Sequence, residues 1–180
     1  MEVVIREAAE GDLDALSALA SLTWSVAFGQ TISPEDRAAH LSRHLARPRF
    51  EEAMRQDVIL VALAAGEMVG FVQFGAARIL QAPLSGDDQE IRRLYVLADH
   101  QDNGIGRRLM GEAMAHPRLA RAGSVCLDVW EHNEGARRFY ARLGFEVIGA
   151  QPFEVASGEA AGLDLIMARL SDAASASRRG

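Results

Sequence analysis

The sequence predicts an α+β fold with a mixed β-sheet, and two patterns carry this prediction. Two apolar runs, at residues 58–65 and 68–75, flank Gly66-Glu67 and are typical of a buried hairpin. Further along, the strands expected at 90–97 and 124–130 are separated by a helical pattern. A right-handed crossover should therefore make these two strands parallel, inside a sheet that is otherwise antiparallel.

The first half of the chain should supply a strand at 3–8 and then two helices. The first helix should run from about Asp12 to Phe28, because its apolar residues recur near the 3.6-residue period. These residues are Leu13, Leu16, Ala20, Trp24 and Ala27. Ser33 followed by Pro34 is typical of an N-cap and a first helical position, so a second helix should begin there. Its buried face should comprise Ala38, Leu41 and Leu45, and residues 49–56 should add one or two turns.

The second half should alternate strands with helices and end in a polar tail. A loop rich in Pro, Gly and Asp is expected at 81–89, before the strand at 90–97. The elements expected after that strand are a helix from about Gly104, a strand at 124–130, a helix at 133–143, and an antiparallel pair at 145–150 and 163–170. Residues 171–180 are small, polar and aperiodic, which predicts a disordered tail after a single domain at 1–170.

Composition narrows the function classes. No apolar run approaches the ~20 residues that cross a bilayer, and acids stand where a signal peptide would carry basic residues. Cys126 is the only cysteine, so no intrachain disulfide can form and we expect a cytoplasmic protein without a membrane partner. The net charge of −6, with adjacent basic residues only in isolated Arg-Arg pairs such as Arg178-Arg179, argues against nucleic acid as a partner. Negative charge would favour a cationic small substrate, although it also simply aids solubility.

A glycine motif follows the strand at 90–97. Residues 101–106 read Gln-Asp-Asn-Gly-Ile-Gly, and the two glycines lie where the first N–H groups of a helix are unpaired. Those amides and the helix dipole form a cradle suited to a pyrophosphate. A dinucleotide fingerprint would need a third glycine where Leu109 stands, and the Gly-Lys-Ser/Thr ending of a P-loop is absent. A plain tight turn from strand to helix is the alternative interpretation.

A second motif occupies residues 133–145, which read Asn-Glu-Gly-Ala-Arg-Arg-Phe-Tyr-Ala-Arg-Leu-Gly-Phe. Asn133 can cap this helix, and Gly144 can end it in the left-handed conformation. The apolar face comprises Ala136, Phe139, Tyr140 and Leu143. Packing alone does not require Tyr140, because leucine would fill the position without a hydroxyl to satisfy.

With these two motifs at this spacing, the sequence resembles the GNAT superfamily of acyl-CoA N-acyltransferases over about residues 3–170. The segments TWSVAFGQTISPEDRAAHL and EIRRLYV are similar to those of bacterial members that acetylate polyamines or other small amines. The resemblance implies a largely antiparallel sheet with a central, splayed parallel strand pair flanked by helices. It also implies an N-acetyltransferase that uses acetyl-CoA as cosubstrate and acts on a small-molecule primary amine, and it suggests a homodimer.

The resemblance further implies where coenzyme A would bind. The pyrophosphate would contact the segment Gln101, Asp102, Asn103, Gly104, Ile105, Gly106 and Arg107. The pantetheine arm would pair with the backbone of Leu94, Tyr95 and Val96 and bond Asn133, and an amide at Leu94 or Tyr95 would polarise the thioester carbonyl. Asp102 and Asn103 depart from the glycine or basic residues of many relatives, so the Asp102 side chain should point to solvent, and Arg107 or Arg142 would compensate for its charge.

Two residues are candidates for catalysis by direct attack of the amine on the thioester. The resemblance implies that the Tyr140 hydroxyl acts as general acid toward the departing thiolate; the alternative is an aromatic core residue. Glu90 stands where some family members place a carboxylate base that takes the proton of the amine. An exposed acid at the strand edge, or an ion pair with Arg92, is the alternative for Glu90, and such a pair would make it a weaker base.

The remaining candidates concern the acceptor and metals. Trp24 and Phe28 would border the acceptor pocket or pack in the core, and Asp87 and Asp88 would attract an ammonium group. His40 and His44 have the i, i+4 spacing of two zinc ligands, but no third ligand is evident, so no metal is expected. Cys126 lies mid-strand and is expected to be a buried structural thiol. A non-catalytic acyl-CoA sensor and a protein or peptide N-acetyltransferase stay open as alternative functions.

Overall fold

The computed structural model describes residues 2–28, 32–79, 87–154 and 160–170, and its elements follow the expected order. The strands are β1 (Val3–Glu7), β2 (Val58–Ala64), β3 (Glu67–Ala76), β4 (Gln89–Val96), β5 (Ser124–Trp130), β6 (Glu146–Glu154) and β7 (Ala160–Leu170). The helices are α1 (Leu13–Phe28), α2 (Pro34–His40), α3 (Arg47–Gln56), α4 (Ile105–Ala115), α5 (Pro117–Ala120) and α6 (Glu134–Arg142). Short 3₁₀ turns, Glu10–Asp12 and Ala98–His100, precede α1 and α4, and a π-helical turn, Leu41–Leu45, follows α2.

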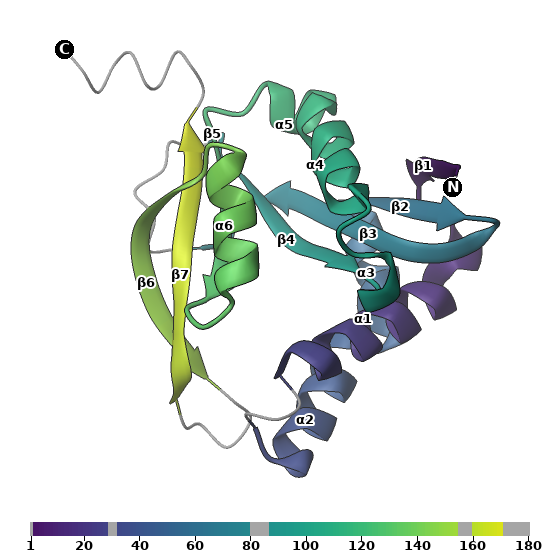
Figure 1. Cartoon of the computed structure of the whole chain (residues 1–180), viewed down its shortest axis with the longest axis horizontal. Coiled ribbons are helices and arrows are strands. Elements are labelled where there is room, and N and C mark those ends of the chain that lie inside the picture. The colour runs from purple at the N-terminus through teal and green to yellow at the C-terminus, as the bar shows by residue number, and fades with distance from the viewer. Residues whose placement is uncertain (1, 29–31, 80–86, 155–159, 171–180) are drawn as a thin grey trace.

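The strands form one seven-stranded sheet in the order β1-β2-β3-β4-β5-β7-β6. Every neighbouring pair is antiparallel except β4 and β5, which are parallel, so the mixed sheet expected from the sequence is confirmed. β7 lies between β5 and β6, which makes β6 an edge strand of the sheet. Figure 1 shows β6, β7 and α6 on one side of the molecule, and β1 to β3 with α1 and α4 on the other.

Local sequence explains the main turns and caps. Ala65 and Gly66 have φ values of 51° and 86°, so both lie in the left-handed region that a two-residue hairpin turn requires. Glu67, expected in that turn, instead begins β3. The Ser33 hydroxyl accepts the Asp36 amide at 3.0 Å and caps α2 as expected. Likewise, Asn133 caps α6 and Gly144 follows its end with φ 86°.

Apolar clusters cover the two faces of the sheet. The first cluster packs α4 and α6 against one face and includes Leu109, Met110, Tyr140 and Phe145. The second packs α1 and α3 against the opposite face and includes Leu16, Trp24, Phe50 and Phe71. The strands therefore bury side chains on both faces, which explains why β2 reads as a continuous apolar run rather than an alternating one.

The parallel pair at the centre of the sheet separates soon after it begins. β4 and β5 pair only through Gln89 with Val125 and Glu90 with Cys126. On its other edge β4 stays paired with β3, but Phe74 pairs with Ile91 and Gln73 with Arg93. Arg92 is therefore an extra residue, a β-bulge that bends the strand. Because β4 and β5 separate after Glu90, a cleft forms between them, and residues of α4 and α6 also line it.

Some elements differ from the sequence prediction. The four-residue helix α5 was not predicted, because four residues are too few to show a helical period. β6 and β7 extend beyond the predicted 145–150 and 163–170 at their joining ends. The predicted loop at 81–86 and the predicted tail at 171–180 lie outside the described residues, so the single domain at 1–170 stays a prediction. Among the described residues, no helix combines the length and apolarity that a membrane span requires.

Candidate active site

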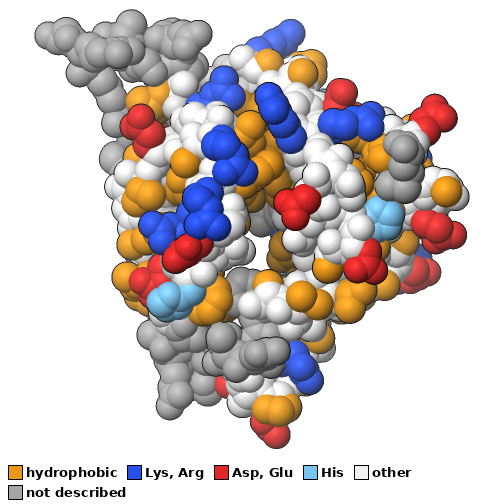
Figure 2. All heavy atoms as spheres, viewed as in Figure 1, with side chains coloured by type: hydrophobic (Ala, Val, Ile, Leu, Met, Phe, Trp, Pro, Cys, Tyr) orange, Lys and Arg blue, Asp and Glu red, His pale blue; other side chains and the backbone are white. Residues whose placement is uncertain are grey.

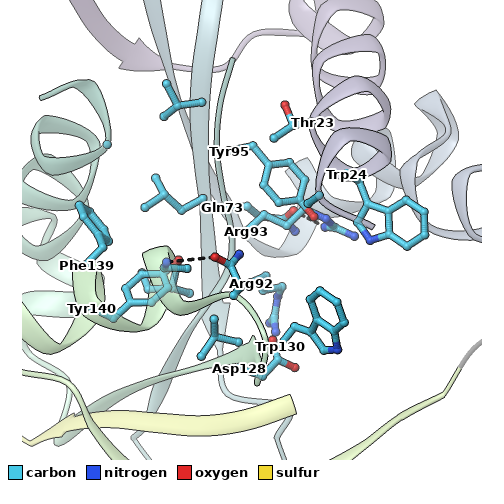
Figure 3. Close-up of a pocket in the computed structure, with 18 of the residues that line it drawn as sticks. Thr23, Trp24, Gln73, Arg92, Arg93, Tyr95, Asp128, Trp130, Phe139 and Tyr140 are labelled. Atoms are coloured by element: carbon cyan, nitrogen blue, oxygen red, sulfur yellow. Dashed lines mark hydrogen bonds between the residues drawn. The ribbon is translucent and has the colours of Figure 1, made fainter. Parts of the chain in front are cut away.

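A continuous cleft of about 1960 Å³ follows the gap between β4 and β5 and reaches both faces of the sheet. Residues of α1, β4, β5, α4 and α6 line it, together with parts of β6 and β7. Figure 3 shows Phe139 and Tyr140 of α6 on one side, Trp24 of α1 on the other, and Tyr95, Arg92 and Arg93 of β4 between them. The cleft therefore brings together most of the residues singled out in the sequence.

At one end of the cleft lies the start of α4. Gly104 is the N-cap with φ 76°, a conformation that favours glycine, and within the described residues no side chain caps this helix end. The first amides of α4 are thus available to an anion. Asp102, with φ 59°, is exposed to solvent, and the exposed Arg107 and Arg142 also line the cleft. Figure 2 shows basic side chains gathered on this face over α4 and α6.

The middle of the cleft exposes one edge of β4. Since no described strand pairs with that edge beyond Glu90, the backbone of Leu94, Tyr95 and Val96 faces the cleft unpaired on this side. The Gln101 side chain donates to the Val96 carbonyl at 3.0 Å and ties the start of the glycine motif to the end of β4. Such an open strand edge can accept an extended ligand as an added strand.

Asn133 lies on the β5 side of the same passage. Its side-chain oxygen accepts the Ala136 amide at 3.0 Å, which uses one polar atom of the side chain to cap α6. Its carboxamide N–H₂ group is the part that can serve a ligand in the cleft. Of the segment 101–107, Asn103 is the position that the structure does not place among the lining residues.

Tyr140 lies on the inner face of α6, 8% exposed, with edge-to-face contacts to Phe139 and Phe145. It is therefore a core residue and a cleft residue at once. Burial raises the pKa of the Tyr140 hydroxyl above its ordinary value, and the nearby Tyr95 and Asp128 raise it further. The hydroxyl accordingly keeps its proton at neutral pH and can donate a hydrogen bond.

Glu90 lies where β4 and β5 separate, and it is nearly buried. One carboxylate oxygen accepts the Arg78 backbone amide at 2.6 Å, and the other lies 3.0 Å from an Arg92 guanidinium nitrogen. The ion pair that the sequence offered as an alternative to the base is therefore present. Both oxygens already have protein partners, which places Glu90 within a structural network as well as at the edge of the cleft.

Two acids that sequence reasoning missed lie deeper in the cleft. Asp128 on β5 pairs in register with Ile166, and Asp164 on β7 pairs with Trp130, so the two-residue period of the strands puts both acids on one face. The Asp128 side chain lines the cleft and is exposed to solvent there. Asp164 also lines the cleft and is half-buried. The signal in the sequence was a single acid inside each of two apolar strand patterns, SVCLDVW and LDLIMARL.

The environment favours the neutral forms of these two acids. Burial raises the pKa of Asp164 to about 7, and the nearby Asp128 carboxylate contributes. Burial also raises the pKa of Asp128, as does the negative charge of Glu90, while Arg93 opposes them. A carboxyl group that titrates near neutral pH can both accept and release a proton under physiological conditions.

Of the four residues predicted to border the acceptor, the structure places Trp24 in the cleft lining. Trp24 is 4% exposed, belongs to the core under α1, and lines the cleft, where its ring stacks on His40 at 4.0 Å. The Phe28 side chain lies outside the described atoms. Asp87 is exposed in a turn and Asp88 accepts the Ser124 hydroxyl at 2.8 Å, and the structure places neither in the cleft lining.

The environments of His40 and Cys126 are typical of structural residues. Burial lowers the pKa of His40 to about 4, with further lowering from His44 and Arg93, so its imidazole is neutral against Trp24. No cluster of three or more His, Cys, Asp or Glu suited to a metal exists among the described residues. Cys126 is buried, and burial followed by the charge of Glu90 raises the pKa of its thiol to about 12, as befits a structural residue.

Comparison with known proteins finds a matching family model, similar sequences and structures of the same fold. The model of the GNAT acetyltransferase family matches residues 18–145. An uncharacterised N-acetyltransferase of Mycobacterium tuberculosis is 30% identical over 148 residues, which cover 80% of this chain and 89% of the relative. The crystal structure of the PaiA N-acetyltransferase of Thermoplasma acidophilum, in complex with coenzyme A, superposes with a TM-score of 0.78 at 20% identity, covering 95% of this chain and all of that one.

Proposed function

The chain belongs to the GNAT family of acetyltransferases, and from this premise we propose that it transfers acetyl from acetyl-CoA to a primary amine of a small molecule. One observation carries the proposal: a single cleft connects the uncapped start of α4, the open edge of β4 and the Tyr140 hydroxyl. These are the parts needed to hold a pyrophosphate, an extended arm and a leaving thiolate in one line.

The residues present fit coenzyme A. The left-handed Gly104 frees the first amides of α4 for the pyrophosphate, and a Cβ at that position would meet nothing within 4 Å. Arg107 and Arg142 supply positive charge, and the backbone of Leu94–Val96 with the Asn133 amide would hold the pantetheine arm. When bound, acetyl-CoA supplies an acetyl group activated as a thioester. The amide of Leu94 or Tyr95 would then polarise its carbonyl oxygen.

Tyr140 would assist departure of the thiolate. Its buried hydroxyl is protonated, and a hydrogen bond from it stabilises negative charge on sulfur more strongly in a water-poor site than in bulk solvent. Because its pKa lies above that of a thiol, complete proton transfer is uphill, so donation of the hydrogen bond is the main contribution.

The amine must lose a proton, since an alkyl ammonium has a pKa near ~10. We assign the proton acceptor to the Asp128–Asp164 pair, because Asp164 titrates near neutrality and both acids line the cleft. Glu90 remains the sequence-based candidate. Its contacts with Arg92 and Arg78 favour a structural contribution, and the two assignments predict different pH profiles.

The acceptor side of the cleft suits a compact cationic amine. The acid pair supplies negative charge as it loses its protons, which for Asp164 happens near pH 7, while Trp24, neutral His40 and Tyr95 supply aromatic surface. An ammonium group between carboxylates and aromatic rings gains both charge attraction and cation–π contact. Small diamines and polyamines are therefore the first acceptors to test, and a peptide with a free N-terminus represents the alternative substrate class.

Release of free thiol from acetyl-CoA, measured against a panel of amines, tests the proposal. The only cysteine of the chain is buried, so a thiol reagent should report the product with little background. We expect turnover with at least one small amine and none without an acceptor. Binding of acetyl-CoA without turnover by any amine or peptide would instead favour a non-catalytic acyl-CoA sensor.

A further inference from the structure

A buried polar network holds the β4 bulge, which lies just beyond Glu90, the last residue of β4 that pairs with β5. Arg92, the extra residue of the bulge, donates from Nε to Asp57 Oδ2 at 2.8 Å and from Nη2 to Asp57 Oδ1 at 3.2 Å. Its Nη2 also donates to the Ala76 carbonyl at 2.6 Å, and its Nη1 lies 3.0 Å from Glu90. The Arg92 and Asp57 side chains are 8% and 1% exposed, so this pair is shielded from water.

The neighbouring residue, Arg93, joins the same network. Gln73 donates to Asp57 Oδ2 at 2.7 Å, and its own side-chain oxygen accepts Arg93 Nη1. In a regular strand, adjacent side chains point to opposite faces of the sheet. Here Arg92 and Arg93 both reach the Asp57–Gln73 pair, an arrangement that the bulge makes possible.

The rest of the sheet makes room for this arrangement. A Cβ at Gly75 would lie 2.0 Å from Asp57 Oδ1, so only glycine at this position leaves space for the carboxylate. Burial alone would raise the pKa of Asp57, but hydrogen bonds from Arg92 and Gln73 outweigh it and hold the pKa below its ordinary value. The carboxylate is therefore charged and serves as the fixed point of the network.

We propose that Asp57, Gln73 and Arg92 are positioning residues that lock the β4 bulge and thereby set the path of the open edge Leu94–Val96 along the cleft. The inference rests on the proposed function, because that edge is the part of β4 that would pair with the pantetheine arm. Asp57 lies between α3 and β2 and does not line the cleft. It can therefore act without touching acetyl-CoA. The lock works through backbone geometry.

The decisive variant is Arg92→Lys, which keeps the charge but loses the bidentate fork. We expect its dissociation constant for acetyl-CoA, measured by calorimetry, to rise at least tenfold, while urea unfolding stays cooperative. Arg6→Lys is the matched control, since Arg6 donates to both oxygens of Asp12 at 2.7 and 2.9 Å and neither residue lines the cleft. This control should bind acetyl-CoA as the wild type does.

A second variant separates positioning from stability. Asp57→Asn keeps the shape of the side chain and should also weaken acetyl-CoA binding at least tenfold. Leu119→Ala, which removes a buried core side chain outside the cleft, should lose stability and keep its affinity for acetyl-CoA. Wild-type affinity and turnover in folded Arg92→Lys and Asp57→Asn would overturn the lock.

Failure of the proposed function would look different, because the wild type itself would then not bind acetyl-CoA. In that case amide hydrogen exchange along β3 and β4 tests the lock directly. Faster exchange at the pairs between Gly70–Gln73 and Arg93–Val96 in Arg92→Lys supports it, and unchanged exchange overturns it.

Discussion

Asp128 on β5 and Asp164 on β7 are diagonal neighbours on one face of the sheet, because Asp128 pairs with Ile166 and Asp164 lies two residues before it. Both acids line the cleft, and the negative charge of Asp128 adds to burial in raising the pKa of Asp164.

Asp164→Asn tests this pair through the pH dependence of turnover. Because the base must be deprotonated, kcat/KM of the wild type should fall as the pH drops through about 7, the pKa of Asp164. The variant should lose at least tenfold in kcat/KM above pH 7, and its kcat/KM should no longer fall as the pH drops through about 7. A wild-type profile in the variant would remove Asp164 from the mechanism.

The same variant has a predicted effect on stability. The pKa of Asp164 is raised in the folded protein, so the folded state binds the proton more tightly and loses stability as pH rises from about 4 to about 7. Asp164→Asn should therefore melt at a higher temperature than the wild type at pH 8, by a few degrees, and at nearly the same temperature below pH 4. Scanning calorimetry at both pH values gives the comparison.

Glu90→Gln distinguishes the two candidate bases. If Glu90 accepts the proton, the loss of turnover should be concentrated at low pH, because the fraction of free amine falls with pH and a base is then needed more. If Glu90 acts with Arg92 in holding β4, turnover should fall by a similar factor at every pH and the limb near pH 7 should persist. Initial rates from pH 5 to 9 decide between these outcomes.

Tyr140→Phe removes one hydroxyl and leaves the ring packing with Phe139 and Phe145 intact. We expect turnover to fall tenfold or more, with unchanged acetyl-CoA affinity and at most a small change in the free energy of unfolding. Steady-state kinetics and urea denaturation on the same sample are sufficient. Unchanged turnover would reduce Tyr140 to a core residue.

Gly104→Ala tests the cradle at the start of α4. Alanine at φ 76° is strained by about 1–2 kcal/mol, and the strain should displace the helix amides and weaken acetyl-CoA binding. Gly111→Ala is the matched control in the same helix, where a Cβ meets nothing within 4 Å. That control should gain about 0.5–1 kcal/mol of stability and bind acetyl-CoA normally.

Much of the fold followed from local signals. The Ser33 and Asn133 caps and the apolar runs of β2 and β3 are properties of short segments, and the structure agrees with them. The hairpin turn was expected at Gly66-Glu67 and lies one residue earlier, at Ala65-Gly66. The shared place of the glycine motif and the open edge of β4 in one cleft was also predictable, because the two segments lie close together in the sequence.

The other half of the site depends on contacts that no short segment reveals. Asp128 and Asp164 come together only because β7 lies next to β5 in the sheet. Asp57 accepts a hydrogen bond from Arg92, which lies 35 residues further along the sequence. Trp24 could not be assigned to core or cleft from its helix stripe, since its ring borders both. Asp87 and Asp88 were attractive because they precede β4, yet the start of that strand lies away from the open edge.

Calorimetric titration of the purified, folded wild type with acetyl-CoA is the most direct test of the account. Saturable heat at one site per chain, strongly reduced in Gly104→Ala and kept in Gly111→Ala, is the predicted result. No heat from either acetyl-CoA or coenzyme A, in a sample that unfolds cooperatively, would contradict the assignment of the cleft and the activity proposed from it.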